Sequence, residues 1–198
     1  MRLYSPLSRE INGEPINTSF DIVLLVIEAF HAPMDELTKI DTAYRLLAKR
    51  PREIPIDKKA AFVQDALSEL MGEADEPEDD RERTIDFTQD ADAIYASFRQ
   101  AYGIDLIEER GRLDWRKFIA LLAGLPQQTL MAQIVQIRTA EIPPINKYNQ
   151  KDVRRLIQQK ARYKINKTSD ERERSLQTGL AKLWSQLEGM VKANDGRR

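Results

Sequence analysis

The chain has 198 residues, of which 41% are hydrophobic and 32% are charged, and its formal net charge is −1. These values are typical of a folded protein of one domain, or two small ones, with a strongly charged surface. The chain has no cysteine, which excludes disulfides, thiolate metal sites and cysteine nucleophiles. No apolar stretch is long enough to span a membrane or resembles a signal peptide, so we expect a cytoplasmic protein.

The first part of the chain predicts an extended lead followed by three helices. Segment 1–18 is expected to be extended or a hairpin, because Asn12-Gly13 favours a two-residue turn. Apolar residues at helical spacing then predict helices over about 18–30, 40–48 and 56–71, with Thr18 as the first N-cap. Residues 73–82 contain seven carboxylates, a composition that favours a flexible acidic linker.

The second part shows the same helical spacing in shorter segments. Helices are predicted over about 94–102 (ended by Gly103), 115–122 (capped by Asp114), 130–137, 152–163 and 170–192. The fold class is therefore all-α, with about seven helices and a short N-terminal extended or hairpin segment. We expect an N-terminal helical lobe (1–72), an acidic linker (73–83), a central helical lobe (84–145) and a basic helical extension (146–198).

Side-chain constellations for catalysis are weak. His31 is the only histidine, which leaves no triad and no histidine-rich metal site, so a capping or surface role is expected for it. Asp105, Glu108 and Glu109 are expected to form caps or salt bridges, and the glycines lie too far apart for a phosphate-binding loop. We therefore expect a protein that is not an enzyme and that uses no cofactor and no metal.

Charge is unevenly distributed along the chain. Residues 151–198 contain 13 basic and six acidic residues, a net charge of +7, which leaves −8 for residues 1–150. The basic stretch 147–167 can be a solvated face or contact the acidic part of the chain, bind a protein partner, or bind nucleic acid. Nucleic acid is the least favoured, because no nucleic-acid-binding module is visible. The candidate basic patch is made of Lys151, Arg154, Arg155, Lys160, Arg162 and Lys164.

A specific motif runs through the centre of the chain. It combines the Asp86-Phe87 lead, the AYGIDL stretch 101–106, Leu113-Asp114-Trp115 and the Gly124-Leu125-Pro126 end. With residues 12–20, this pattern resembles the bacteriophage "gene product fifteen" family over roughly residues 8–140. Members are found in tail gene regions of siphophages and prophages, usually just before the tape measure gene. That gene position resembles the position of tail assembly chaperones.

The resemblance implies a phage tail-morphogenesis protein and supplies no catalytic residue. We expect a tail assembly chaperone that binds the tape measure protein, with the tail tube protein as a second partner and homo-oligomerisation allowed. It would act in the cytoplasm of the bacterial host and be absent from the mature virion. The alternatives are a structural virion adaptor and a nucleic-acid-binding regulator that uses residues 147–167.

Partner contacts are expected on exposed members of the central motif and on the last helix. For Tyr102 and Trp115, a place in the core is the alternative. The last helix, 170–192, is expected either to pack on its own chain or to bind a partner. The residues are Tyr102, Ile104, Leu106, Trp115, Leu183, Trp184 and Leu187.

Overall fold

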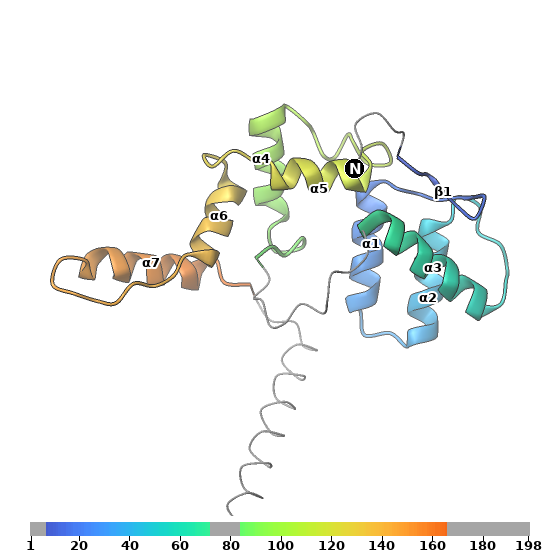
Figure 1. Ribbon diagram of the computed structural model, residues 1–198, viewed down its shortest axis with the longest axis horizontal. Helices are drawn as coiled ribbons and strands as arrows, with labels where there is room; N and C mark the ends of the chain where they lie inside the picture. Colours follow the sequence, from blue (N-terminus) through green and yellow to red (C-terminus); the bar gives the residue numbers. More distant parts are fainter. Residues whose placement is uncertain (1–6, 72–83, 166–198) are drawn as a thin grey trace, which may run out of the picture.

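The computed structural model describes residues 7–71 and 84–165, and within them seven helices and one short hairpin make up a mainly α fold (Figure 1). This confirms the predicted fold class. The acidic segment and the last predicted helix lie outside the described residues. The elements are β1 (Glu10–Ile11), β2 (Glu14–Pro15), α1 (Phe20–His31), α2 (Glu36–Leu47), α3 (Ile56–Met71), α4 (Ala91–Tyr102), α5 (Trp115–Ala123), α6 (Leu130–Thr139) and α7 (Gln150–Arg162).

The N-terminal hairpin turns at the predicted pair. Asn12 has a φ of 50° and Gly13 a φ of 79°, and a type I′ hairpin turn needs positive φ at both of these positions. The two strands are antiparallel, with Glu10 opposite Pro15. Ile16, which follows the hairpin, is fully buried and forms a bridge to the end of α2.

Two predicted helix starts are wrong, and both have a local cause. Thr18 does not cap α1: Ser19 takes the N-cap position, and the Thr18 carbonyl accepts the Trp115 N–H at 2.7 Å, which ties Thr18 to the start of α5. Helix α2 begins at Glu36, one turn before the predicted start. Asp35 makes this possible, since its carboxylate accepts the Thr38 N–H at 3.0 Å and so caps the helix.

The predicted end of α4 and the predicted cap of α5 are confirmed, whereas α4 begins at Ala91, three residues before the predicted start. Gly103 ends α4 in the left-handed region with a φ of 68°, a conformation that glycine adopts without a steric penalty. Asp114 caps α5 by accepting the Arg116 N–H at 3.0 Å. These two residues fix the ends of the connection 103–114 that carries the central motif.

One hydrophobic core connects the two predicted helical lobes. Helices α1, α2 and α3 pack together, α4 packs on α6, and α5 contacts α1, α3 and α4. The buried cluster runs without interruption from Ile16 to Ile134. At its centre the Phe118 ring stacks on Phe20 at 4.9 Å and on Phe98 at 5.2 Å between centroids. The predicted division at 73–83 falls outside the described residues and stays a prediction.

Candidate interaction surface

Residues 140–165, the connection after α6 together with α7, form an arm that projects from the helical body (Figure 1). Among the described elements, α7 packs against α6 alone. Val153 is buried, at 1% exposure, yet it is not part of the main core cluster. Apart from Tyr163, which packs against the main core, the arm therefore has a small apolar contact of its own and leaves most of its surface to solvent.

Large apolar side chains are exposed along this arm. Four of them lie between residues 142 and 157: Ile142 is 51% exposed, Ile145 63%, Tyr148 83% and Ile157 44%. Single exposed apolar residues are ordinary, but a group on one projecting element is typical of a surface that binds another protein.

The same arm carries the predicted basic patch. It contains seven basic and two acidic residues, and Arg155 is paired with Asp152. Lys160 differs from the rest, because it is half-buried and its Nζ donates to the Arg138 carbonyl at 2.6 Å. The remaining patch residues are exposed: Lys151, Arg154, Arg155, Arg162 and Lys164.

A buried ion pair anchors the arm to the body. The Arg138 guanidinium, at the end of α6, donates to both Asp90 carboxylate oxygens at 2.6 and 2.7 Å. It also donates to the Tyr163 carbonyl at 2.7 Å and to the Thr84 carbonyl at 2.8 Å. The two charged side chains are only 8% and 4% exposed. The Arg138 guanidinium thus joins three segments: α6, the segment 84–90 before α4, and the end of α7.

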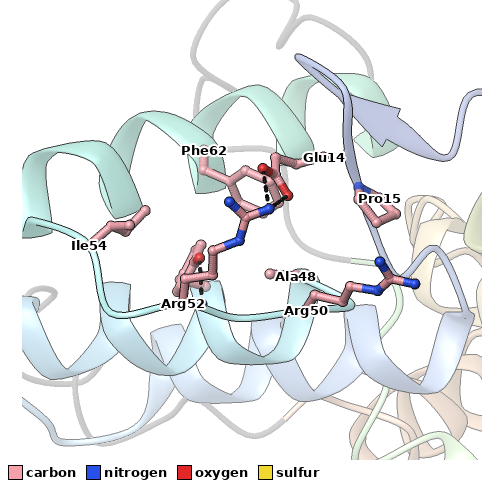
Figure 2. A pocket seen from close by; sticks show the side chains of 8 residues that line it. Glu14, Pro15, Ala48, Arg50, Arg52, Ile54 and Phe62 are labelled. Atoms are coloured by element: carbon pink, nitrogen blue, oxygen red, sulfur yellow. Dashed lines mark hydrogen bonds and ion pairs between the residues drawn. The ribbon is translucent and has the colours of Figure 1, made fainter.

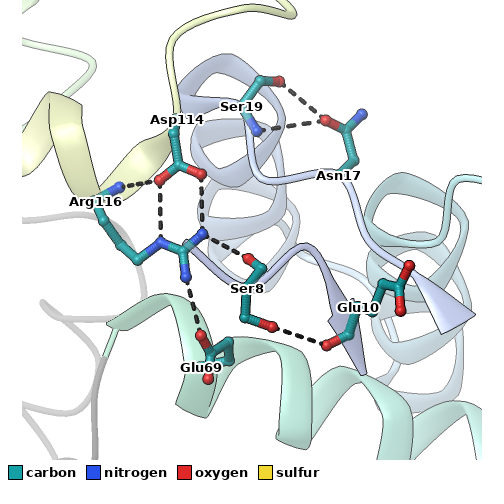
Figure 3. Close-up of polar contacts among 7 residues, drawn as sticks. All are labelled: Ser8, Glu10, Asn17, Ser19, Glu69, Asp114 and Arg116. Atoms are coloured by element: carbon teal, nitrogen blue, oxygen red, sulfur yellow. Dashed lines mark hydrogen bonds and ion pairs between the residues drawn. The ribbon is translucent and has the colours of Figure 1, made fainter. Parts of the chain in front are cut away.

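A second polar cluster, centred on the buried Asp114, joins the N-terminal segment to the central motif (Figure 3). The Asp114 carboxylate accepts hydrogen bonds from Arg116 Nε at 3.0 Å and from Nη2 at 2.9 Å. The same guanidinium donates to Glu69 of α3 at 2.9 Å and to the Ser8 carbonyl at 2.7 Å. The four residues of this cluster bond to one another, so the cluster stabilises the fold and leaves no open binding site.

This cluster predicts a stability that depends on acid pH. Burial raises the pKa of Asp114, but hydrogen bonds from Arg116 and then from Thr18 outweigh burial and leave the pKa below its ordinary value. As the pH falls, Asp114 is therefore protonated at a higher pH in the unfolded chain than in the folded protein. Stability is lost as the pH falls below about 4. Asp114→Asn is expected to lower the free energy of unfolding by about 1–3 kcal/mol at pH 7. On acidification the variant should lose less stability than the wild type.

Urea unfolding at pH 7 and at about pH 3 measures this difference, with Glu141→Gln, a change of an exposed carboxyl, as the control. An Asp114→Asn protein that loses as much stability on acidification as the wild type would contradict the assigned role of the carboxylate.

A small cavity lies between the hairpin, the end of α2 and α3 (Figure 2). Its volume is about 90 Å³, whereas pockets for small organic ligands usually measure about 300–1,000 Å³. The Arg52–Glu14 ion pair, at 2.8 Å, closes one side of it. Residues 7–71 and 84–165 contain no group of His, Asp or Glu side chains placed to hold a metal ion. None of their helices is long and apolar enough to cross a membrane.

The predicted contact residues of the central motif lie in or against the core. Trp115 and Leu106 are buried, at 5% and 7% exposure, so neither presents surface to a partner in this structure. For Trp115 this agrees with the alternative place in the core. Tyr102 is half-buried and donates its hydroxyl to the Leu121 carbonyl at 2.9 Å. Ile104 is half-buried and packs against the core.

Other parts of the prediction are either untested or incomplete. Leu183, Trp184 and Leu187 lie outside the described residues. Ile107, which directly follows the AYGIDL stretch of the motif, is 60% exposed and was not among the predicted contact residues. The apolar residues of the connection 140–149 were not among them either, because no helical spacing marks them. His31 has the expected capping position, with Nδ1 2.7 Å from the Ile27 carbonyl.

Comparison with known proteins gives one match. The family model described as Bacteriophage Gp15 protein matches residues 4–165. No curated protein and no solved structure matches the chain significantly.

Proposed function

The chain belongs to the Bacteriophage Gp15 protein family, and from this phage membership we propose that it is a tail-morphogenesis protein that chaperones the tape measure protein. A tape measure protein is long, helical and prone to aggregate before the tail tube encloses it. A chaperone for it needs apolar side chains with charged neighbours. The observation that carries the proposal is the arm, where four exposed apolar side chains stand among exposed cations.

The arm suits an amphipathic partner helix. Its isoleucines and Tyr148 can cover the apolar stripe of such a helix, as in other complexes in which a helix lies in an apolar groove. The surrounding lysines and arginines can pair with carboxylates beside that stripe and orient the helix. Each contact would be modest, but many copies along one tape measure would bind it in a multivalent manner. Tube subunits could then displace single copies as they polymerise.

Co-expression with the tape measure protein of the same phage tests this proposal. The double variant Ile145→Ser/Tyr148→Ser is expected to lower the affinity for the tape measure by about tenfold or more, since apolar anchor side chains dominate such interfaces. The amount of soluble tape measure should fall accordingly. Met71→Ser, which changes a 50% exposed residue away from the arm, is the matched control and should leave that amount unchanged.

Ile107→Ser separates the arm from the central motif as the contact surface. If Ile107→Ser lowers the amount of soluble tape measure and the arm variant does not, the motif is the contact surface instead. If the tape measure is equally soluble with no copy of this protein present, the chaperone function itself is wrong.

The place of action follows from the same proposal. A chaperone works in the host cytoplasm and leaves before the tail is complete, so mass spectrometry of purified virions should not detect it. A stoichiometric amount in the virion would favour the structural adaptor. Binding of DNA or RNA by the arm, lost steeply as salt is added, would favour the nucleic-acid-binding regulator.

A further inference from the structure

The end of the α1–α2 pair carries a surface that is the chemical opposite of the arm. We define the acidic corner as the exposed residues between positions 25 and 37. It exposes three large apolar side chains, with Leu25 at 46%, Met34 at 37% and Leu37 at 61%. The whole stretch 10–38 contains six Asp or Glu residues and no Lys or Arg. The exposed carboxylates of the corner are Glu28, Asp35 and Glu36.

The corner and the arm match in two independent respects. Both expose large aliphatic side chains, which favours their mutual burial in water. Their charges are of opposite sign, since the arm has seven basic and two acidic residues, and opposite potentials are what guide two protein surfaces together. In the molecule the arm lies at one end of the long axis, and α1 and α2 lie toward the other (Figure 1). The arm is therefore out of reach of its own acidic corner.

We propose that the arm of one copy docks on the acidic corner of a second copy. The contact is head-to-tail, so a dimer keeps one unused arm and one unused corner. Further copies can bind there, and the assembly grows into a chain unless it closes into a ring. In the absence of another ligand this contact covers the exposed apolar side chains of the arm. The self-association does not depend on the proposed function. If that function is correct as well, a tape measure helix competes with the corner for the arm.

The first test is sedimentation velocity of the full-length protein over a range of concentrations and salt. The mean mass is expected to rise with concentration and to fall as salt is added, because screening weakens attraction between exposed charges. A wild-type protein that stays monomeric at every concentration in low salt would overturn the proposal.

Charge reversal then identifies the two surfaces. The arm variant Lys151→Glu/Arg154→Glu and the corner variant Glu28→Lys/Glu36→Lys change exposed residues. Either variant alone is expected to raise the dissociation constant of self-association by about tenfold or more, since like charges then face each other. Circular dichroism verifies that each variant is folded. The control Arg112→Glu/Lys117→Glu reverses two exposed charges elsewhere and should associate like the wild type.

Mixing the two variants gives the sharpest result. The arm variant keeps a normal corner and the corner variant keeps a normal arm, so an equal mixture should form dimers and nothing larger. If the mixture stays monomeric, or if the corner variant alone associates like the wild type, arm-to-corner docking is wrong.

This outcome is independent of the chaperone function. The corner variant keeps its arm, so it should still keep the tape measure soluble even when it no longer self-associates. A wild-type monomer that solubilises the tape measure would reject the self-association and leave the chaperone intact.

Discussion

Replacement of Arg138 by methionine is expected to lower the free energy of unfolding by about 3–5 kcal/mol, the range for breaking a buried ion pair from one side. The change leaves the Asp90 carboxylate, whose side chain is 4% exposed, without its bidentate partner. It also removes the donors to the Tyr163 and Thr84 carbonyls. Because these bonds hold the end of α7 against α6 and connect α6 to the segment before α4, the arm should lose its fixed position along with stability. Chemical denaturation measures the first effect, and amide hydrogen exchange in α7 measures the second.

A double-mutant cycle separates the ion pair from the packing of the arginine stem. Arg138→Met/Asp90→Asn should be less destabilised than the sum of the two single variants, because no buried charge is left unpaired. Arg138→Lys should rescue little, since an ammonium group cannot reproduce the planar donors that reach both carboxylate oxygens. Additive effects of the two single changes would show that the pair does not act as one unit.

Most of the helical fold could be predicted, because local signals and tertiary packing agree there. In α3 the apolar residues recur at helical spacing from Ile56 to Met71, and the helix has those bounds. At the start of α1 the local capping signal was misleading, since Thr18 bonds to Trp115, almost a hundred residues later in the chain. A capping residue can be recognised from its neighbours, but a competing partner from a distant segment cannot.

The candidate surface was harder to predict than the fold. The charges of α7 are visible in the sequence, and the basic patch was therefore found, apart from the inward bond of Lys160. Whether an apolar residue is exposed cannot be seen from the sequence in the same way. Trp115 was expected at the surface or in the core and lies in the core, whereas Tyr148 was not among the predicted contact residues and is 83% exposed. Which of the two is covered depends on whether another element packs over it, and residue type does not reveal that. The Arg138–Asp90 anchor was missed for the same reason, since nothing local indicates that these residues meet.

Replacement of Phe118 by alanine is expected to cost about 3–5 kcal/mol, as for other large aromatic residues removed from a core. Phe118 is 1% exposed, and its ring contacts the rings of Phe20, Phe98 and Trp115 at 4.9, 5.2 and 5.7 Å. These neighbours come from α1, α4 and α5, so the cavity would open where the N-terminal and central helices meet. Stacked rings add about 0.5–1.5 kcal/mol per pair beyond burial, and Phe118→Leu should therefore recover only part of the loss.

The Phe118 variant also distinguishes one cooperative unit from two lobes. With a shared core, amide hydrogen exchange should accelerate by similar factors in α2 and in α4, and unfolding should remain a single transition. If α1–α3 formed an independent lobe, exchange in α2 would be unchanged while α4 and α5 lost protection. Phe62→Ala is the matched control, because Phe62 is half-buried and its ring contacts Tyr44 of α2, a residue of the same N-terminal group. If both Phe118→Ala and Phe62→Ala accelerate exchange equally in α2 and in α4, the helices form one cooperative unit. The arm then projects from a single body, against which a partner helix can be held.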